Sequence, residues 1–308
     1  MKRHSRTVLR ILPAAALAGL LAVTACAPRD GRDTVAVGSK EFTEQLILGE
    51  MMALLIEERT ELRVVRRLNL GGTMICHTAL TRGDIDLYAE YTGTALTAIL
   101  DEAATADPDA AFETVKQAYA RRFDCTWLTP FGFNNTYTLT IDSAFAAEHG
   151  VTSIGDLEEL AGGLTAGFTA EFAVREDGYP GLQAAYGFRF GENIDMDPGL
   201  MYRAVDRGEV DVICAFATDG RIAAYDLTTL DDNKGFFPPY YAAPVVRNAT
   251  LAAHPELRDV LERLAGLLDD DTMRRLNLEV DEYKRDPADV ARDFLVAREL
   301  VPAQTEEK

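Results

Sequence analysis

One sixteen-residue pattern occurs twice in this chain and constrains its fold more than any other feature. Residues 79–94 read ALTRGDIDLYAEYTGT, and residues 204–219 read AVDRGEVDVICAFATD. The two copies align without a gap. Each predicts a helix end, a glycine turn and a short apolar strand, over 85–89 and 210–215.

The repeat predicts two related lobes around one cleft. In each copy an aromatic residue, Tyr91 or Phe216, comes five residues after the second aspartate and just beyond the predicted strand. Ligands of open α/β sheets bind outside the carboxyl ends of the strands, so both rings are expected to face the cleft. The alternative is that two unrelated βα units share a common Arg-Gly-Asp turn.

The N-terminus predicts export. Four basic residues precede an apolar run, 11–25, that is too short for a comfortable membrane span. The run ends in Val23-Thr24-Ala25-Cys26, which resembles a bacterial lipoprotein signal, with cleavage before Cys26 and lipid on its thiol. The alternative is a plain secretory signal with a chance cysteine. We expect a signal peptide over 1–25, a tether over 26–33 and an extracytoplasmic, membrane-anchored protein.

The composition excludes nucleic acid as a partner. Removal of the signal removes four basic residues and no acidic ones, so the formal net charge falls from −19 to −23. Such a chain repels nucleic-acid phosphates. Three cysteines remain, so at least one is free or pairs elsewhere; Cys76 and Cys125 are the better candidates for a disulfide than pairs with Cys214, because both fall in the predicted first lobe. The four histidines are scattered, so no metal site is expected.

Alternating strands and helices predict parallel sheets. Two extended segments, 127–141 and 236–241, are expected to cross between the lobes, with the hinge near 134–138 and 237–242. The first lobe is therefore expected to comprise 34–134 plus 240–308, and the second 135–239. The expected strands are 34–38, 62–68, 164–168 and one near Leu227; the expected helices are 41–58, 111–123, a short one opened by Ser153, 197–207, 256–268, 270–276 and 287–300.

No catalytic motif is present: the sequence has neither G-x-S-x-G nor a P-loop. Asp86 and Asp211 occupy matching places in the repeat, where a structural role at the turn is expected. Aromatic residues, by contrast, gather where the hinge and cleft are predicted. Each ring alone is typical of a core, but together they indicate a cage for a quaternary ammonium, which binds ring faces; the rings are Tyr91, Tyr137, Phe216, Tyr240 and Tyr241.

A series of motifs covers residues 34–300: Gly38-Ser39-Lys40-Glu41-Phe42-Thr43-Glu44-Gln45, Leu70-Gly71-Gly72-Thr73, Gly83–Tyr88, Glu90–Thr94, Phe133–Tyr137, Ala217–Ile222 and Phe237–Tyr240. In these motifs the chain resembles the substrate-binding proteins of osmoprotectant ABC importers, which take up glycine betaine, carnitine, choline and relatives. The resemblance implies an α/β, two-lobed type II periplasmic-binding-protein fold with two crossover strands, and no cofactor.

The resemblance also implies a cage of Tyr91, Tyr137, Phe216 and Tyr240 at the lobe interface. The family often has tyrosine where this chain has Phe216, which keeps the ring face and loses the hydroxyl. Tyr240 is expected to face the cleft and Tyr241 to point away, because neighbours in an extended segment alternate sides.

By position in the resemblance, Lys40, Thr94 and Arg175 are the candidates to hold a ligand carboxylate, whereas the residues alone would favour solvent-exposed surface charges. Lys40 follows the first strand beside a helix N-terminus, and Arg175 belongs to the second lobe, where it can grip a carboxylate with two hydrogen bonds. Asn135, at the crossover, is a candidate to offer its backbone carbonyl to the positive end of the ligand.

We therefore predict a protein that captures a quaternary-ammonium osmolyte and delivers it to an ABC permease without catalysis. Glycine betaine or a similar betaine is the first choice, because two cationic side chains suit a ligand that brings its own carboxylate; choline and carnitine are alternatives. From a different class, the alternative is a two-lobed α/β enzyme with Asp86, Asp211 or Glu171 as acid–base groups. A third option, a sensor domain that binds the same ligand and signals, is disfavoured, because the chain ends at Lys308 without a transmembrane or signalling segment.

Overall fold

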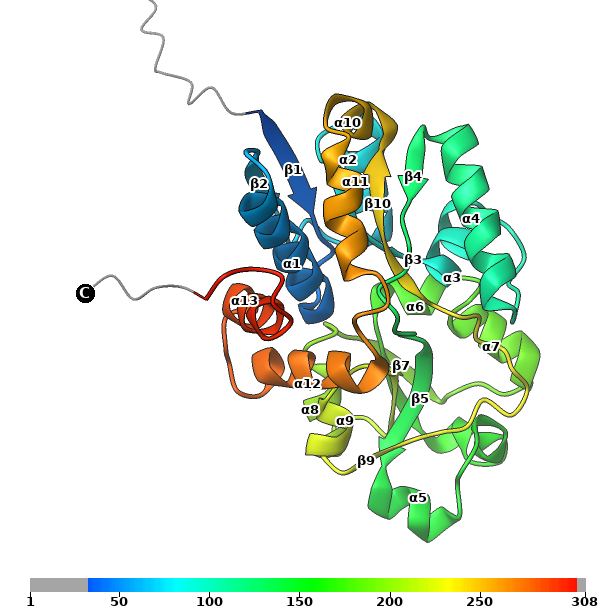
Figure 1. The fold of residues 1–308 in the computed structure, drawn as a ribbon. Helices are drawn as coiled ribbons and strands as arrows, with labels where there is room; N and C mark the ends of the chain where they lie inside the picture. Colours follow the sequence, from blue (N-terminus) through cyan, green and yellow to red (C-terminus); the bar gives the residue numbers. More distant parts are fainter. Residues whose placement is uncertain (1–32, 304–308) are drawn as a thin grey trace, which may run out of the picture. The chain divides into compact units, whose positions relative to one another are not determined.

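The computed structural model describes residues 33–303, and the predicted two-lobed α/β fold is confirmed (Figure 1). The first lobe contains β1 (Thr34–Gly38), β2 (Arg63–Arg67), β3 (Leu87–Tyr91), β4 (Cys125–Trp127) and β10 (Ala242–Arg247). The second lobe contains β5 (Tyr137–Asp142), β6 (Thr165–Phe168), β7 (Glu192–Asp195), β8 (Val212–Phe216) and β9 (Leu227–Thr229).

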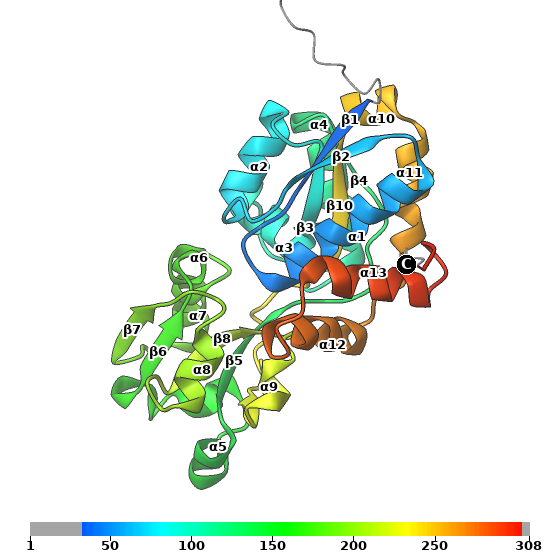
Figure 2. The same ribbon diagram turned by 90° about the vertical axis from the view of Figure 1, so that its left-hand side faces the viewer.

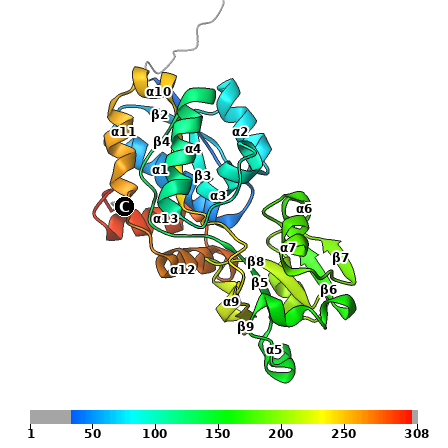
Figure 3. The ribbon, with the colours of Figure 1, turned by 90° about the vertical axis from the view of Figure 1, so that its right-hand side faces the viewer.

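Helices cover both sheets. Those of the first lobe are α1 (Thr43–Arg59), α2 (Thr73–Arg82), α3 (Thr92–Thr94), α4 (Pro108–Arg122), α10 (Asn248–Ala253), α11 (Glu256–Leu261), α12 (Asp270–Asp281) and α13 (Pro287–Ala297). Those of the second are α5 (Ser143–His149), α6 (Ala170–Val174), α7 (Tyr179–Tyr186), α8 (Met201–Asp206) and α9 (Arg221–Ala224). Figures 2 and 3 show the two sheets in separate lobes.

Both sheets have the same topology. Their strand orders are β2-β1-β3-β10-β4 and β7-β6-β8-β5-β9. In each sheet one strand, β10 or β5, runs antiparallel to both of its neighbours. Each of these strands is the first that the chain forms after it passes into that lobe. The sequence predicted parallel sheets and missed this reversal, which the crossing of the chain imposes. The lobe boundaries at 134/135 and 239/240 stay a prediction.

The sequence repeat forms the same turn in both lobes. Gly83 and Gly208 follow α2 and α8 with φ angles of 82° and 65°, which glycine adopts without strain. The strands β3 and β8 begin two residues later than predicted, because the residues after each glycine still bond back to the helix. Tyr91 and Phe216 are consequently the last residues of their strands rather than residues beyond them.

The repeated aspartates tie each turn to the neighbouring strand. Asp86 Oδ2 accepts a hydrogen bond from the Ala36 N–H at 2.8 Å, and Asp211 Oδ2 accepts one from the Thr165 N–H at 2.7 Å. The predicted structural role is confirmed, although the partner is the adjacent parallel strand. Neither aspartate lines the cavity described below, so the enzyme alternative finds no support in this pair.

The C-terminal helices pack on the first lobe, as predicted. α11, α12 and α13 all contact α1, which is buried along most of its length (Figure 2). α12 is longer than predicted and also reaches the second lobe, where Arg274 Nε donates to the Ala217 carbonyl at 2.8 Å. α8 begins at Met201 rather than at Asp197-Pro198, which leaves that segment free to line the cavity.

The predicted Cys76–Cys125 disulfide is wrong. Cys76, Cys125 and Cys214 are buried free thiols. The Sγ of Cys76 lies 3.3 Å from the Ser39 carbonyl oxygen, whereas that of Cys125 lies 3.3 Å from the Phe123 carbonyl oxygen. Burial raises the pKa of Cys76 to about 12 and that of Cys125 to about 11, so both thiols stay protonated at neutral pH. Cys26 lies outside the described residues.

Candidate ligand-binding site

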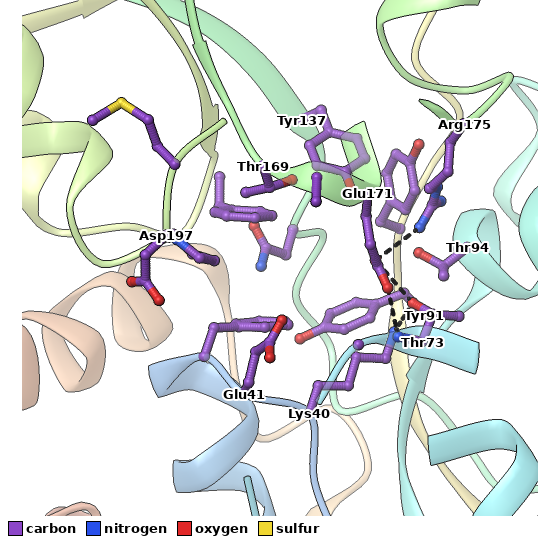
Figure 4. Close-up of a pocket in the computed structure, with 18 of the residues that line it drawn as sticks. Lys40, Glu41, Thr73, Tyr91, Thr94, Tyr137, Thr169, Glu171, Arg175 and Asp197 are labelled. Carbon is purple, nitrogen blue, oxygen red and sulfur yellow. Dashed lines mark hydrogen bonds and ion pairs between the residues drawn. The ribbon is translucent and has the colours of Figure 1, made fainter. Parts of the chain in front are cut away.

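A cavity of about 330 Å³ lies between the two lobes, a size suited to a small organic ligand. The structure brings all the predicted ligand-binding residues to its wall: Lys40, Tyr91, Thr94, Tyr137, Arg175, Phe216 and Tyr240. Figure 4 labels the first five of them. The wall is built from the carboxyl ends of the central strands and from the crossover segments, as the strand-end rule predicts. Within residues 33–303, no group of His, Cys, Asp and Glu is arranged to hold a metal.

Sheet register explains why the repeated aromatics meet the crossovers. Phe216, the last residue of β8, pairs with Tyr137, the first residue of β5. Tyr91, the last residue of β3, pairs with Ala242, the first residue of β10. Tyr240 precedes β10 and lines the cavity, whereas Tyr241 is absent from the wall, as predicted.

The rings of both lobes lie close together. The Tyr137 ring centroid is 5.6 Å from that of Phe216 and 5.2 Å from that of Tyr240. Phe42, which falls at the start of the helix expected over 41–58, adds a ring that was not among the predicted site residues. It stacks on Phe216 at 5.6 Å with planes 5° apart and lies 6.2 Å from Tyr91. Since Phe42 lies shortly after β1, the strand-end rule was the signal that could have found it.

Glu44 holds the Tyr91 ring in place and joins the lobes. This glutamate on α1 is almost fully buried, and its Oε1 accepts hydrogen bonds from the Tyr91 hydroxyl at 2.7 Å and from Asn135 Nδ2 at 2.8 Å. Its Oε2 accepts from Thr218 of the second lobe and from Asn277 of α12. Burial raises the pKa of Glu44, and burial also keeps the Tyr91 phenol protonated by raising its pKa. The predicted contact from the Asn135 carbonyl stays a prediction.

Lys40 is buried and already paired. Its Nζ lies 2.6 Å from Glu90 Oε1 and donates to Thr73 Oγ1 at 3.0 Å. The Nζ is also 5.2 Å from the centroid of the Tyr91 ring. Glu90 is fully buried and accepts a second hydrogen bond from the Tyr88 hydroxyl at 2.9 Å. The positive charge of Lys40 is therefore neutralised within its own lobe.

Arg175 is paired in the same way. Its Nε and Nη2 donate to the two carboxylate oxygens of Asp177 at 2.7 and 2.5 Å, and the Tyr240 hydroxyl donates to Asp177 at 2.6 Å. Burial opposes the charge of Arg175, but Tyr137 and Asp177 outweigh it and raise the pKa of the guanidinium. Burial likewise opposes the charge of Asp177, yet the bonds from Arg175 lower its pKa. A betaine was the first choice from sequence because Lys40 and Arg175 were expected to need a ligand carboxylate. In the structure both cations already have carboxylate partners in the protein, so they no longer favour a betaine.

The remaining charges of the wall are acidic. Besides Lys40 and Arg175, the cavity is lined by Glu41, Glu171, Asp195 and Asp197. Glu171, on α6 of the second lobe, reaches the first lobe, where its Oε1 accepts from the Thr73 N–H at 2.6 Å (Figure 4). The enzyme alternative named Glu171 as an acid–base group, but here its carboxylate is held at a helix N-terminus. The cavity as a whole favours a ligand that carries positive charge.

Two lobes of one topology, joined by two crossovers and enclosing a ring-lined cavity of ligand size, define a solute-binding protein. Residues 33–297 match the family model described as the substrate binding domain of the ABC-type glycine betaine transport system. The chain belongs to this family. It is therefore the substrate-binding component of an ABC importer, it works outside the cytoplasm, and it is not an enzyme.

Individual relatives agree with this assignment. The carnitine transport binding protein OpuCC of Listeria monocytogenes is 37% identical over 266 residues, 86% of each chain. The ergothioneine transport permease/ergothioneine binding protein EgtU of Helicobacter pylori is 39% identical over 260 residues, which are 84% of this chain and 46% of that protein. A solved structure of a glycine betaine/carnitine/choline ABC transporter matches with a TM-score of 0.72 and 37% identity, covering 86% of this chain and 99% of that one. The predicted periplasmic-binding-protein fold is confirmed.

Proposed function

We propose that this protein captures a quaternary-ammonium osmolyte, glycine betaine or a similar betaine, and delivers it to an ABC permease. The observation that carries the proposal is the set of aromatic rings contributed to one cavity by both lobes. Capture would involve movement of the lobes about the two crossovers, which touch where the Asn135 N–H donates to the Tyr240 carbonyl at 3.1 Å.

The chemistry of the ligand supports the proposal. Glycine betaine, carnitine, choline and ergothioneine all carry a trimethylammonium group, which cannot donate a hydrogen bond. Such a group is attracted to ring faces, and more strongly where water is excluded. The acidic excess in the wall adds attraction for the same positive group. Choline or carnitine remains the alternative ligand, because the rings and the acidic wall recognise only the trimethylammonium group, which all these ligands share.

Calorimetric titration of the mature protein tests the proposal. Glycine betaine, carnitine and choline are expected to bind saturably to one site. Glycine serves as the matched control ligand, since it differs from glycine betaine only in lacking three methyl groups and is expected not to bind. Equal affinity for glycine and glycine betaine would show that the rings do not read the methylated cation.

We further propose that Cys26 carries a lipid anchor, because Val23-Thr24-Ala25-Cys26 ends the apolar N-terminal run. Within residues 33–303 no helix has the length and apolar character to cross a bilayer. Cys26→Ser is expected to release the protein from the membrane fraction or to block its processing. Mass spectrometry of the wild-type mature N-terminus gives the direct readout, and an unlipidated N-terminus would refute the anchor.

A further inference from the structure

The carboxylate of Glu171 occupies a position built for an anion. Its Oε1 accepts from the Thr73 N–H at 2.6 Å, and its Oε2 accepts from the Thr73 hydroxyl at 3.2 Å. Thr73 is the first residue of α2, a ten-residue helix whose N-terminus carries partial positive charge. Arg175 Nη1 lies 3.6 Å from the same carboxylate, and Lys40 Nζ donates to the same Thr73 hydroxyl (Figure 4).

These donors include the groups that a ligand carboxylate would use. Lys40 and Arg175 line the cavity, and each already has a buried carboxylate partner of its own. The Thr73 N–H and hydroxyl are further donors at the start of α2, and Glu171 has taken both. A ligand that places its carboxylate at the start of α2 must therefore compete with Glu171, whereas a purely cationic ligand gains from the negative charge that Glu171 places in the wall.

Of the three carboxylates paired with the two cations, Glu171 is best able to leave. The side chain of Asp177 is 1% exposed and that of Glu90 is fully buried, whereas that of Glu171 is 38% exposed. Glu171 also belongs to a short helix of the second lobe, while its main partner, Thr73, belongs to the first. Its contact therefore depends on how the two lobes approach each other.

The absence of a side chain at Gly72 lets the carboxylate enter. A Cβ at Gly72 would lie 2.2 Å from Glu171 Oε1, which is closer than two atoms can approach. The φ of Gly72 is −74°, an angle that any residue adopts, so its backbone does not require glycine. Close approach of an anion to the start of α2 is the feature that glycine permits here.

We propose that Glu171 is a specificity-determining residue, whose carboxylate competes with the carboxylate of a zwitterionic ligand and substitutes for it when the ligand is a cation. This inference rests on the proposed function, because it concerns the same cavity and the same class of ligand. Choline binds with Glu171 in place, and a betaine binds after displacing it.

Titrations of glycine betaine and choline with matched variants test the inference. Glu171→Gln keeps the shape of the side chain and removes its charge, and Glu171→Ala removes the competing group. Both variants are expected to shift the ratio of the two affinities toward glycine betaine by about tenfold, as expected for a hydrogen bond to a charged group. Glu176→Gln is the control, since it removes an equal charge from an exposed position of the same lobe that does not line the cavity.

A second substitution tests the position itself. In the Glu171→Ala background, Gly72→Ala puts a Cβ where the carboxylate would lie, so it is expected to remove the gain for glycine betaine. Thermal unfolding of each variant verifies that it is folded. An unchanged ratio in both Glu171 variants, with wild-type binding intact, overturns this inference alone. If the wild-type protein binds neither glycine betaine nor choline, the proposed function is refuted, and the inference with it.

Discussion

Replacement of Arg175 by alanine is expected to lower the free energy of unfolding by about 3–5 kcal/mol, the usual cost of breaking a buried ion pair by removing one partner. The substitution leaves the Asp177 carboxylate, whose side chain is 1% exposed, without the two hydrogen bonds that compensate its charge. The remaining donor, the Tyr240 hydroxyl at 2.6 Å, cannot replace a guanidinium. Chemical denaturation, monitored by tryptophan fluorescence or circular dichroism, measures the loss.

Neutralising the partner should reverse most of this loss. Asp177→Asn in the Arg175→Ala background removes the buried charge and is expected to recover a large part of the stability. Lys116→Ala is the surface control, because its partner Glu113 is also solvent-exposed, and no measurable change is expected. A loss for Arg175→Ala as small as that of this control would show that the buried pair is not ionised.

The paired charge also changes how ligand binding by Arg175 variants is interpreted. The sequence predicts that Arg175→Ala weakens the binding of betaine by roughly 1.5–3 kcal/mol and the binding of choline much less. In the structure, Asp177 also holds the Tyr240 hydroxyl, so this single variant disturbs the cage for both ligands. Arg175→Gln combined with Asp177→Asn keeps a neutral, hydrogen-bonding pair. In that background a loss confined to glycine betaine would show that Arg175 contacts the ligand carboxylate.

Replacement of Tyr137 by leucine is expected to weaken binding of a quaternary ammonium by about 2 kcal/mol, or roughly 30-fold. The Tyr137 ring lies between lobe walls, 5.6 Å from Phe216 and 5.2 Å from Tyr240, and it is nearly fully buried. Leucine keeps most of the apolar volume and removes the ring face. Replacement of Tyr91 or Tyr240 by leucine should also weaken binding. These variants additionally remove a hydrogen bond, from the Tyr91 hydroxyl to Glu44 or from the Tyr240 hydroxyl to Asp177.

Tyr137→Phe is the matched control for this prediction. Among the described residues, the Tyr137 hydroxyl has no hydrogen-bond partner, so phenylalanine changes little except the hydroxyl itself. Calorimetric titration with glycine betaine compares the affinity of Tyr137→Phe, which keeps the ring, with that of Tyr137→Leu, which lacks it. If Tyr137→Leu binds as tightly as the wild type, or if Tyr137→Phe is equally weak, the ring face does not carry recognition.

Much of the fold and part of the site were predictable because they depend on local chemistry. A glycine with positive φ after a helix, an aspartate beside it and an apolar run beyond produce the same turn and strand wherever they occur, so the repeat predicted two related lobes. The aromatic at each strand end had to lie at the sheet edge where ligands bind. Those features, with the family motifs, placed seven residues on one cavity wall.

The charges of the site were decided by the tertiary structure. Lys40 and Arg175 looked like free cations in the sequence, yet folding places Glu90 and Asp177 against them. Glu171 contacts Thr73, which is 98 residues away in the chain. A charge can be buried only if an opposite charge or several hydrogen bonds compensate it. The partner of Arg175 is two residues away in the chain, whereas Lys40 and Glu171 find partners that are 50 and 98 residues away.

The same reasoning explains the other differences. The sequence placed Glu44 in the expected helix over 41–58 and assigned it no partner, but α1 is covered by α12 and α13, and the Glu44 carboxylate is buried among four donors. The antiparallel strands β5 and β10 follow from the passage of the chain between lobes, and no local pattern encodes strand direction. The sequence by itself determined the turns, the strand ends and the aromatic rings at them, because these depend on neighbouring residues. Only the tertiary structure decided which charges are paired and which groups remain for a ligand, because Coulomb interactions depend on distance in space rather than in sequence.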